Sequence, residues 1–163
     1  MNKPQIKVAT IDLYNNERNE GMRCIKEIVA DAGIKNSNID LKYDVFETRY
    51  KGDVPDLSYD IFISSGGPGS PFEDEKKQWD KDYFTLLDKI WNHNQTSEQK
   101  KYIFFICHSF QMMARFFQFG EVNQRVINSF GVMPFLNTDE GKNDTILKDL
   151  TDPFYAADIR HWQ

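Results

Sequence analysis

The sequence predicts an α/β fold with a doubly wound, mostly parallel sheet and helices on both faces. Two observations lead to this prediction. Short apolar runs alternate along the chain with longer segments of helical periodicity, and two of these runs end abruptly in turns. Strands that alternate with helices are joined by right-handed crossovers and lie parallel in one sheet. Because ligands bind beyond the carboxyl ends of such strands, we expect function at these turns.

Size and composition limit the classes of protein and partner. The 163 residues suffice for one domain, and 40% of them are hydrophobic, enough for a substantial core. A formal charge of -5, with acidic and basic residues mixed, argues against nucleic acid or an anionic membrane as a partner. The sequence has no bilayer-spanning window and no secretory signal, so we expect a cytoplasmic location. Cys24 and Cys107 match neither a disulfide framework nor a zinc spacing, and we expect neither a metal nor a cofactor.

The first part of the chain contains three expected strands and one helix. Residues 6–13 form a short apolar run that ends in turn residues. Apolar residues at helical spacing then predict a helix that ends at Gly33. Residues 41–46 alternate as in a strand near the edge of a sheet, whereas residues 61–63 have no polar break and are typical of a central parallel strand.

The middle of the chain repeats the pattern with stronger periodicity. Apolar residues between 75 and 92 recur at i, i+4 and i+7, which predicts a helix. Residues 102–106 form a fourth apolar strand. The helix expected from His108 to about Phe119 is apolar nearly all round, so we expect it to be buried and to end at Gly120.

The remainder of the chain has weaker patterns. Residues 124–130 and 132–136 fit a hairpin or two short strands around Gly131. One helical turn is expected at 145–150, and a last strand at 154–159.

Two strand ends carry residues suited to chemistry. Cys107 lies between the fourth strand and its helix, where the helix dipole and unpaired N–H groups favour a thiolate. The N–H of His108 and that of Gly67, in the turn after residues 61–63, can stabilise an oxyanion, since glycine lets the backbone approach a substrate closely. The plainer interpretation is a buried core cysteine and an ordinary strand-to-helix turn. The turn lacks the lysine of a phosphate-binding loop, which disfavours a nucleotide site.

Residues 65–71 and the segment around Cys107 together resemble the class I glutamine amidotransferase family. In that family a G-G-P-x-S/x-P turn precedes a nucleophile elbow of the form G-x-C-x-G-x-Q, and the resemblance spans nearly the whole chain. It implies a flavodoxin-like topology and hydrolysis of the glutamine side-chain amide through a cysteine thioester, with ammonia passed to a synthetase as in GMP synthase. It places the nucleophile at Cys107, the oxyanion donors at Gly67 and His108, and the substrate beside Gly66 and Gln111.

The chain also departs from the family pattern. Phe105 and Ser109 stand where the family has glycines, and phenylalanine is the more serious change in a strained turn. The late H-x-E motif, which supplies the base and its carboxylate, has no counterpart. The chain has three histidines, His93, His108 and His161, and none of them is followed two residues later by Glu. We therefore expect residues 1–163 to form a single amidotransferase-like domain that is incomplete at its C-terminus.

Three functions stay open on the sequence. The first is a glutaminase, with glutamine as substrate and a synthetase subunit or domain as partner; a second copy of the chain is a further candidate partner. The second is a related cysteine hydrolase acting on γ-glutamyl or other substrates, which a contact between Cys107 and the carboxylate of Glu17 or Glu20 would favour. The third is a catalytically weakened binding module, suggested by Phe105 and the missing base.

Overall fold

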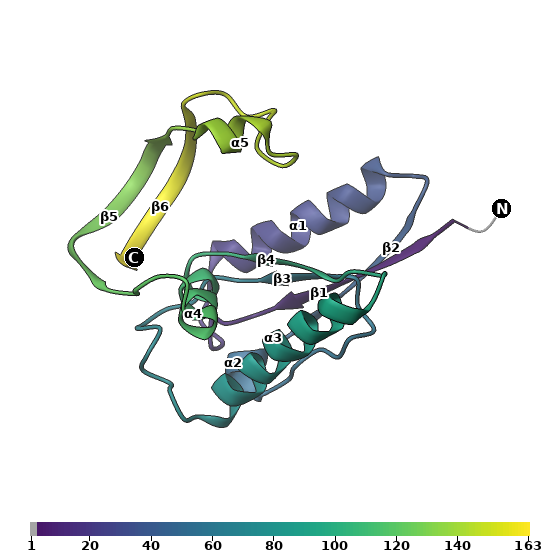
Figure 1. Cartoon of the computed structure of the whole chain (residues 1–163), viewed down its shortest axis with the longest axis horizontal. Coiled ribbons are helices and arrows are strands. Elements are labelled where there is room, and N and C mark those ends of the chain that lie inside the picture. Colours follow the sequence, from purple (N-terminus) through teal and green to yellow (C-terminus); the bar gives the residue numbers. More distant parts are fainter. Residues whose placement is uncertain (1–2) are drawn as a thin grey trace. The chain divides into compact units, whose positions relative to one another are not determined.

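The computed structural model describes residues 3–163, and the chain divides into two compact units, Met1–Glu121 and Val122–Gln163. Figure 1 draws both units along the chain, from purple to yellow. The expectation that residues 1–163 form one amidotransferase-like domain stays a prediction.

A four-stranded sheet forms the centre of the first unit, in the order β2–β1–β3–β4 (Figure 1). All three pairings are parallel, as predicted. Residues 41–46 lie in an edge strand and residues 61–63 in an interior strand, which confirms both predictions. The strands are β1 (Gln5–Ile11), β2 (Asp40–Phe46), β3 (Ile61–Ser64) and β4 (Tyr102–Phe105).

Helices cover both faces of this sheet. Successive strand residues point to opposite faces, so Val8 and Ala9 of β1 belong to different halves of the core. Val8 lies in one apolar cluster with residues of α1, and Ala9 in another with residues of α3 and α4. Figure 1 accordingly shows α1 and α3 on opposite sides of the strands, which confirms the doubly wound α/β prediction. The helices of this unit are α1 (Glu20–Lys35), α2 (Thr48–Lys51), α3 (Gln78–Thr96) and α4 (His108–Phe117).

Two helix ends were predicted wrongly. α1 continues past Gly33 because Asn36 closes it, with its backbone N–H and its side-chain amide both bonded to the carbonyl of Ala32. α4 ends before Gly120, because Gln118 already adopts the left-handed conformation, with φ 54°. The side-chain amide of Asn36 and the left-handed backbone of Gln118 therefore do here what a glycine does at other helix ends.

The expected burial of the helix after Cys107 is only half right. Met112 and Ala114 of α4 are buried against the sheet, whereas Phe110 and the following Phe119 are exposed. The short helix α2, which ends at the left-handed Gly52, was not predicted, since four residues are too few to show a periodic pattern.

An antiparallel pair of strands forms the second unit. β5 (Gln124–Phe135) pairs with β6 (Phe154–Trp162), and the short helix α5 (Asp139–Asn143) lies between them in the chain. The expected break at Gly131 is wrong: β5 continues through this residue, which adopts φ 146° opposite Asp158. Within residues 3–163, no helix has both the length and the apolar character required to cross a bilayer.

Candidate active site

The turns after β3 and β4 lie side by side, because these strands are parallel neighbours that end at the same edge of the sheet. A Cβ atom added to Gly66, in the turn after β3, would lie 3.6 Å from the Cβ of Cys107, which follows β4. The structure therefore brings together two of the residues that the sequence singled out.

Cys107 has a strained backbone at the junction between β4 and α4. Its φ of 51° and ψ of −104° lie outside the regions that residues with a side chain ordinarily adopt, and its side chain is exposed. β4 ends two residues before it, and α4 begins at His108. Strain of this kind costs about 1–3 kcal/mol and is found mainly where function requires it. The geometry presents a thiol at the start of a helix, where its anion is favoured.

The two departures from the family motif are accommodated without loss of this turn. Ser109 is fully buried; its hydroxyl accepts a hydrogen bond from the N–H of Ile106 at 2.9 Å and donates one to the carbonyl of Ser64 at 2.8 Å. Phe105 is half-buried, pairs in register with Ser64 and packs against the apolar cluster under α3. The serine thus links the elbow to β3, and the phenylalanine contributes to the core.

Close packing surrounds both glycines of the neighbouring turn, most tightly at Gly67. A Cβ on Gly67 would come 2.5 Å from the carbonyl oxygen of Leu13, which is backbone and cannot swing away. A Cβ on Gly66 would lie 3.1 Å from the hydroxyl of Tyr14. The turn after β3 is therefore pressed against the loop that follows β1.

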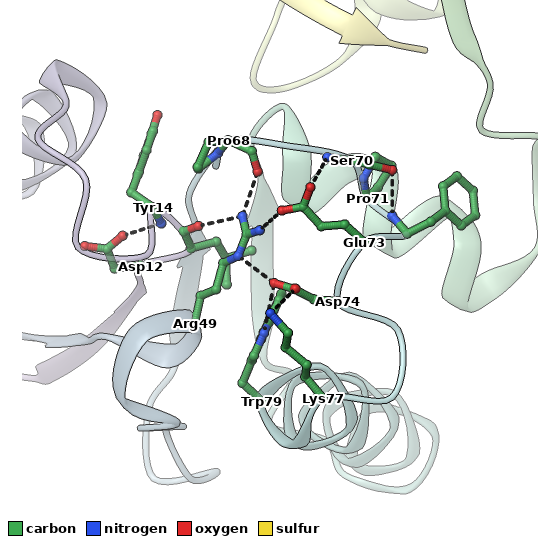
Figure 2. A network of polar contacts seen from close by, with 12 residues as sticks. Asp12, Tyr14, Arg49, Pro68, Ser70, Pro71, Glu73, Asp74, Lys77 and Trp79 are labelled. Carbon is green, nitrogen blue, oxygen red and sulfur yellow. Dashed lines mark hydrogen bonds and ion pairs between the residues drawn. The ribbon is translucent and has the colours of Figure 1, made fainter.

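Arg49 of α2 holds this turn in place, as Figure 2 shows. Its side chain is only 3% exposed. Nη1 donates to the carbonyl of Pro68 at 2.7 Å, Nε donates to Oδ2 of Asp74 at 3.0 Å, and Nη2 pairs with Glu73. One buried guanidinium therefore joins α2 to the turn that contains Gly67.

The carboxyl of Asp74 is a second centre of this network (Figure 2). Burial opposes its ionisation, yet the hydrogen bond from Lys77 and the charge of Arg49 hold the pKa of Asp74 below its ordinary value. Trp79 also donates its indole N–H to this carboxyl, at 3.2 Å. Farther along the same segment, Arg115 of α4 donates to the carbonyl of Pro71, which ties the elbow helix to the segment.

Sequence reasoning missed Arg49, Arg115 and Tyr14. For the two arginines, Arg49 in α2 and Arg115 in α4, no signal existed, because the sequence does not show that a charged side chain will be buried. Tyr14 follows the carboxyl end of β1, so the rule that led to Cys107 also indicated this residue.

His108 is buried, with 2% of its surface exposed, so its imidazole does not lie in solvent beside the exposed thiol. Burial, followed by the charge of Arg49, lowers the pKa of His108 to about 4. A ring with so low a pKa is a weak acceptor for the thiol proton. Its backbone N–H, at the first position of α4, is one of those that a helix leaves without an intrahelical partner.

The other predicted groups are placed as follows. His93 lies in α3, where its Nε2 is 2.8 Å from the carbonyl of Gln99, and His161 lies in β6 of the second unit. Gln111 is buried in α4. At the start of α1, the carboxylate of Glu20 pairs with Arg23, and the hydroxyl of Tyr14, in the loop before α1, lies beside Gly66.

A cavity of about 660 Å³ lies elsewhere in the first unit, between residues 52–57 and α3, and is lined by none of the predicted site residues. Within residues 3–163, no three His, Cys, Asp or Glu side chains are grouped so as to hold a metal ion.

Comparison with known proteins identifies the fold. No family model and no curated protein matches the sequence. Among solved structures, a glutamine amidotransferase from Thermotoga maritima superposes with a TM-score of 0.72 at 18% identity, over 97% of this chain and 61% of its own. A putative GMP synthase subunit from Thermoplasma acidophilum gives 0.64 at 16% identity, over 97% and 66%. A glutamine amidotransferase from Methylobacillus flagellatus gives 0.60 at 12% identity, over 100% and 57%.

These likenesses show that the chain has a class I glutamine amidotransferase-like fold of the α/β, flavodoxin-like type. The chain spans about three-fifths of the length of the solved structures that it matches. At identities this low, the likeness concerns the fold alone.

Proposed function

We propose that this chain is a glutaminase domain of the class I glutamine amidotransferase type, which hydrolyses the side-chain amide of glutamine and passes ammonia to a synthetase, as in GMP synthase. The observation that supports it most is the strained backbone of Cys107 at the start of α4, beside the Gly66 turn. The fold is in keeping with the proposal, since two of the solved neighbours are described as glutamine amidotransferases and one as a putative GMP synthase subunit.

In the proposed reaction the Sγ of Cys107 attacks the amide carbon of the glutamine side chain. A C–S bond forms, the C–N bond breaks, and the proton lost by the thiol leaves with the amine as ammonia. Water then hydrolyses the thioester and releases glutamate. No redox step is involved, so these atoms balance without another reactant.

The backbone N–H groups of His108 and Gly67 are the proposed donors to the oxyanion of the tetrahedral intermediate. The first belongs to the first turn of α4, and the second to the turn held by Arg49. Gly66 and Gln111 are proposed to border the substrate, Gly66 because it lies next to the Cβ of Cys107.

The proton acceptor for the thiol is neither His93 nor His108 in this proposal. His93 is engaged with Gln99 at the end of α3, and His108 is buried with a pKa of about 4. The same observation favours a second candidate, a catalytically weakened binding module that retains the elbow but turns over glutamine poorly. A hydrolase that uses the carboxylate of Glu20 is less favoured, because this carboxylate pairs with Arg23.

Ammonia release from glutamine, together with labelling by a diazo-ketone analogue of glutamine, tests the proposal. We expect ammonia release that is lost in Cys107→Ala and retained in the matched control Cys24→Ala, and label on Cys107 alone. Labelling of Cys107 without release would favour the binding module. Release unaffected by Cys107→Ala would refute the proposal, as would a Cys107 that neither takes the label nor reacts with iodoacetamide faster than Cys24.

A further inference from the structure

Tyr14 is held firmly in the loop between β1 and α1. Its backbone N–H donates to the carboxylate of Asp12 at 2.8 Å, and its carbonyl accepts from the N–H of Glu17 at 3.0 Å. Figure 2 shows its side chain directed away from the guanidinium of Arg49. The ring is half-buried and packs in the apolar cluster under α1.

The phenolic hydroxyl lies between two glycines, each of which leaves room for it. A Cβ on Gly21, at the start of α1, would collide with this oxygen, and a Cβ on Gly66 would lie 3.1 Å from it. The same point on Gly66 lies 3.6 Å from the Cβ of Cys107. The Tyr14 hydroxyl and Cys107 therefore flank Gly66 within the candidate active site.

Chemically, this hydroxyl is a neutral donor. Burial first, and then the nearby negative charges of Cys107 and Asp12, raise the pKa of Tyr14 above its ordinary value of 10, so the phenol keeps its proton at neutral pH. A half-buried tyrosine hydroxyl ordinarily has a hydrogen-bond partner.

Two nearby carboxylates, those of Asp12 and Glu20, already have partners. The carboxylate of Asp12 accepts the backbone N–H of Tyr14, and Glu20, at the start of α1, pairs with Arg23. The thiolate form of Cys107, on the other side of Gly66, is a suitable acceptor for the neutral phenol of Tyr14. A hydrogen bond to a charged acceptor is stronger than one between neutral groups, so it would stabilise the thiolate.

We infer that the Tyr14 hydroxyl donates a hydrogen bond to the thiolate of Cys107 and so acts as a further catalytic residue, one that keeps the nucleophile ionised. The O–H bond stays intact, so no proton is transferred. The inference depends on the proposed function for its choice of Cys107 as the nucleophile, but its effect on the thiol does not require turnover of glutamine.

The test measures the pH dependence of alkylation of Cys107 by iodoacetamide, in a Cys24→Ser background of the full chain. Alkylation follows the thiolate fraction. Because a hydrogen bond to a charged group is among the stronger ones, Tyr14→Phe is expected to raise the apparent pKa of Cys107 by about one unit, which slows alkylation about tenfold below that pKa. Tyr43→Phe, on the exposed face of the edge strand β2, is the matched control and is expected to change nothing.

Gly66→Ala serves as a second variant should Tyr14→Phe fail to fold. Its methyl group would come between the hydroxyl and Cys107 and is expected to raise the apparent pKa of the thiol in the same direction. An unchanged or lowered pKa in the folded variants would overturn the inference. If Tyr14→Phe raises the pKa of Cys107 but the wild-type chain releases no ammonia from glutamine, the result would count against the proposed function and leave this inference standing.

Discussion

Replacing Arg49 by methionine tests whether the buried guanidinium holds the turn beside the candidate nucleophile. Methionine has a similar length and no charge, so it fills much of the space while removing every polar contact of the side chain. The carbonyl of Pro68 and the carboxylates of Glu73 and Asp74 lose their common donor.

The expected loss of stability depends on how well each partner of Arg49 can replace the hydrogen bond that it loses. Removing one member of a buried ion pair costs about 3–5 kcal/mol, because the remaining charge stays buried without its partner. Here Asp74 keeps Lys77 and Trp79, and the side chain of Glu73 is 44% exposed and can turn to water. We therefore expect the lower end, a loss of about 3 kcal/mol in the free energy of unfolding.

Thermal unfolding followed by circular dichroism measures this loss, which corresponds to a fall of about 10 °C in Tm for a unit of this size. Arg49→Lys keeps the charge but not the planar fork, and we expect a smaller loss. Arg23→Met is the control, since its pairs with Glu20 and Glu27 lie in solvent on α1 and should leave Tm unchanged. An Arg49→Met variant with the same Tm as the Arg23→Met control would refute a stabilising role for the Arg49 network.

Three further predictions concern the elbow and its turn. The pKa of His108 is depressed to about 4 in the folded chain, so on acidification the unfolded chain takes up a proton at this residue before the folded chain does. The free energy of unfolding should therefore fall by about 2 kcal/mol between pH 7.5 and pH 5. Urea titrations of wild type and His108→Gln at both pH values check this, and an equal fall in the variant would contradict it. Ser109→Ala should cost about 1 kcal/mol in urea unfolding, because the hydroxyl loses its hydrogen bonds with Ile106 and Ser64 while the N–H of Ile106 and the carbonyl of Ser64 stay bonded to each other. Ser109→Gly should cost no less, and a neutral result for both would show that water replaces the hydroxyl. Gly67→Ala should displace the turn from the carbonyl of Leu13 and abolish labelling of Cys107 by the glutamine analogue, whereas iodoacetamide should still react; retained labelling would show that the turn tolerates the shift.

The parts of the fold that follow from periodicity were predictable from the sequence. The interior strand at residues 61–63 lacks polar residues because both of its faces are covered, and the long amphipathic pattern of α3 matches its single buried face. Helix ends were not predictable in the same way. At Asn36 and Gln118 a side chain or a left-handed residue closes the helix, and neither residue type marks an end as strongly as glycine.

The site residues that follow directly after a strand were predictable from the sequence. The residues whose role depends on a buried side chain were not. Cys107 and Gly66 follow neighbouring parallel strands, so their proximity follows from topology. Arg49 is positioned by a four-residue helix, and its contacts to Pro68 and Asp74 join segments far apart in the chain. A sequence pattern contains no information on such long-range polar contacts.

The glycines missing from the elbow motif raised the question of whether the turn forms at all. Its formation does not depend on them, because the strained φ falls on Cys107 itself, and the residues on either side adopt ordinary conformations. Glycine at 109 would remove the hydroxyl that bonds to both the N–H of Ile106 and the carbonyl of Ser64, and would leave only the direct hydrogen bond between these two groups. Serine at this position therefore stabilises the turn through two side-chain hydrogen bonds, whereas the glycine of the motif provides conformational freedom. In both cases the strained cysteine can be accommodated. Both proposed functions retain this turn, so the group that accepts the proton of Cys107 would distinguish the proposed glutaminase from the proposed binding module.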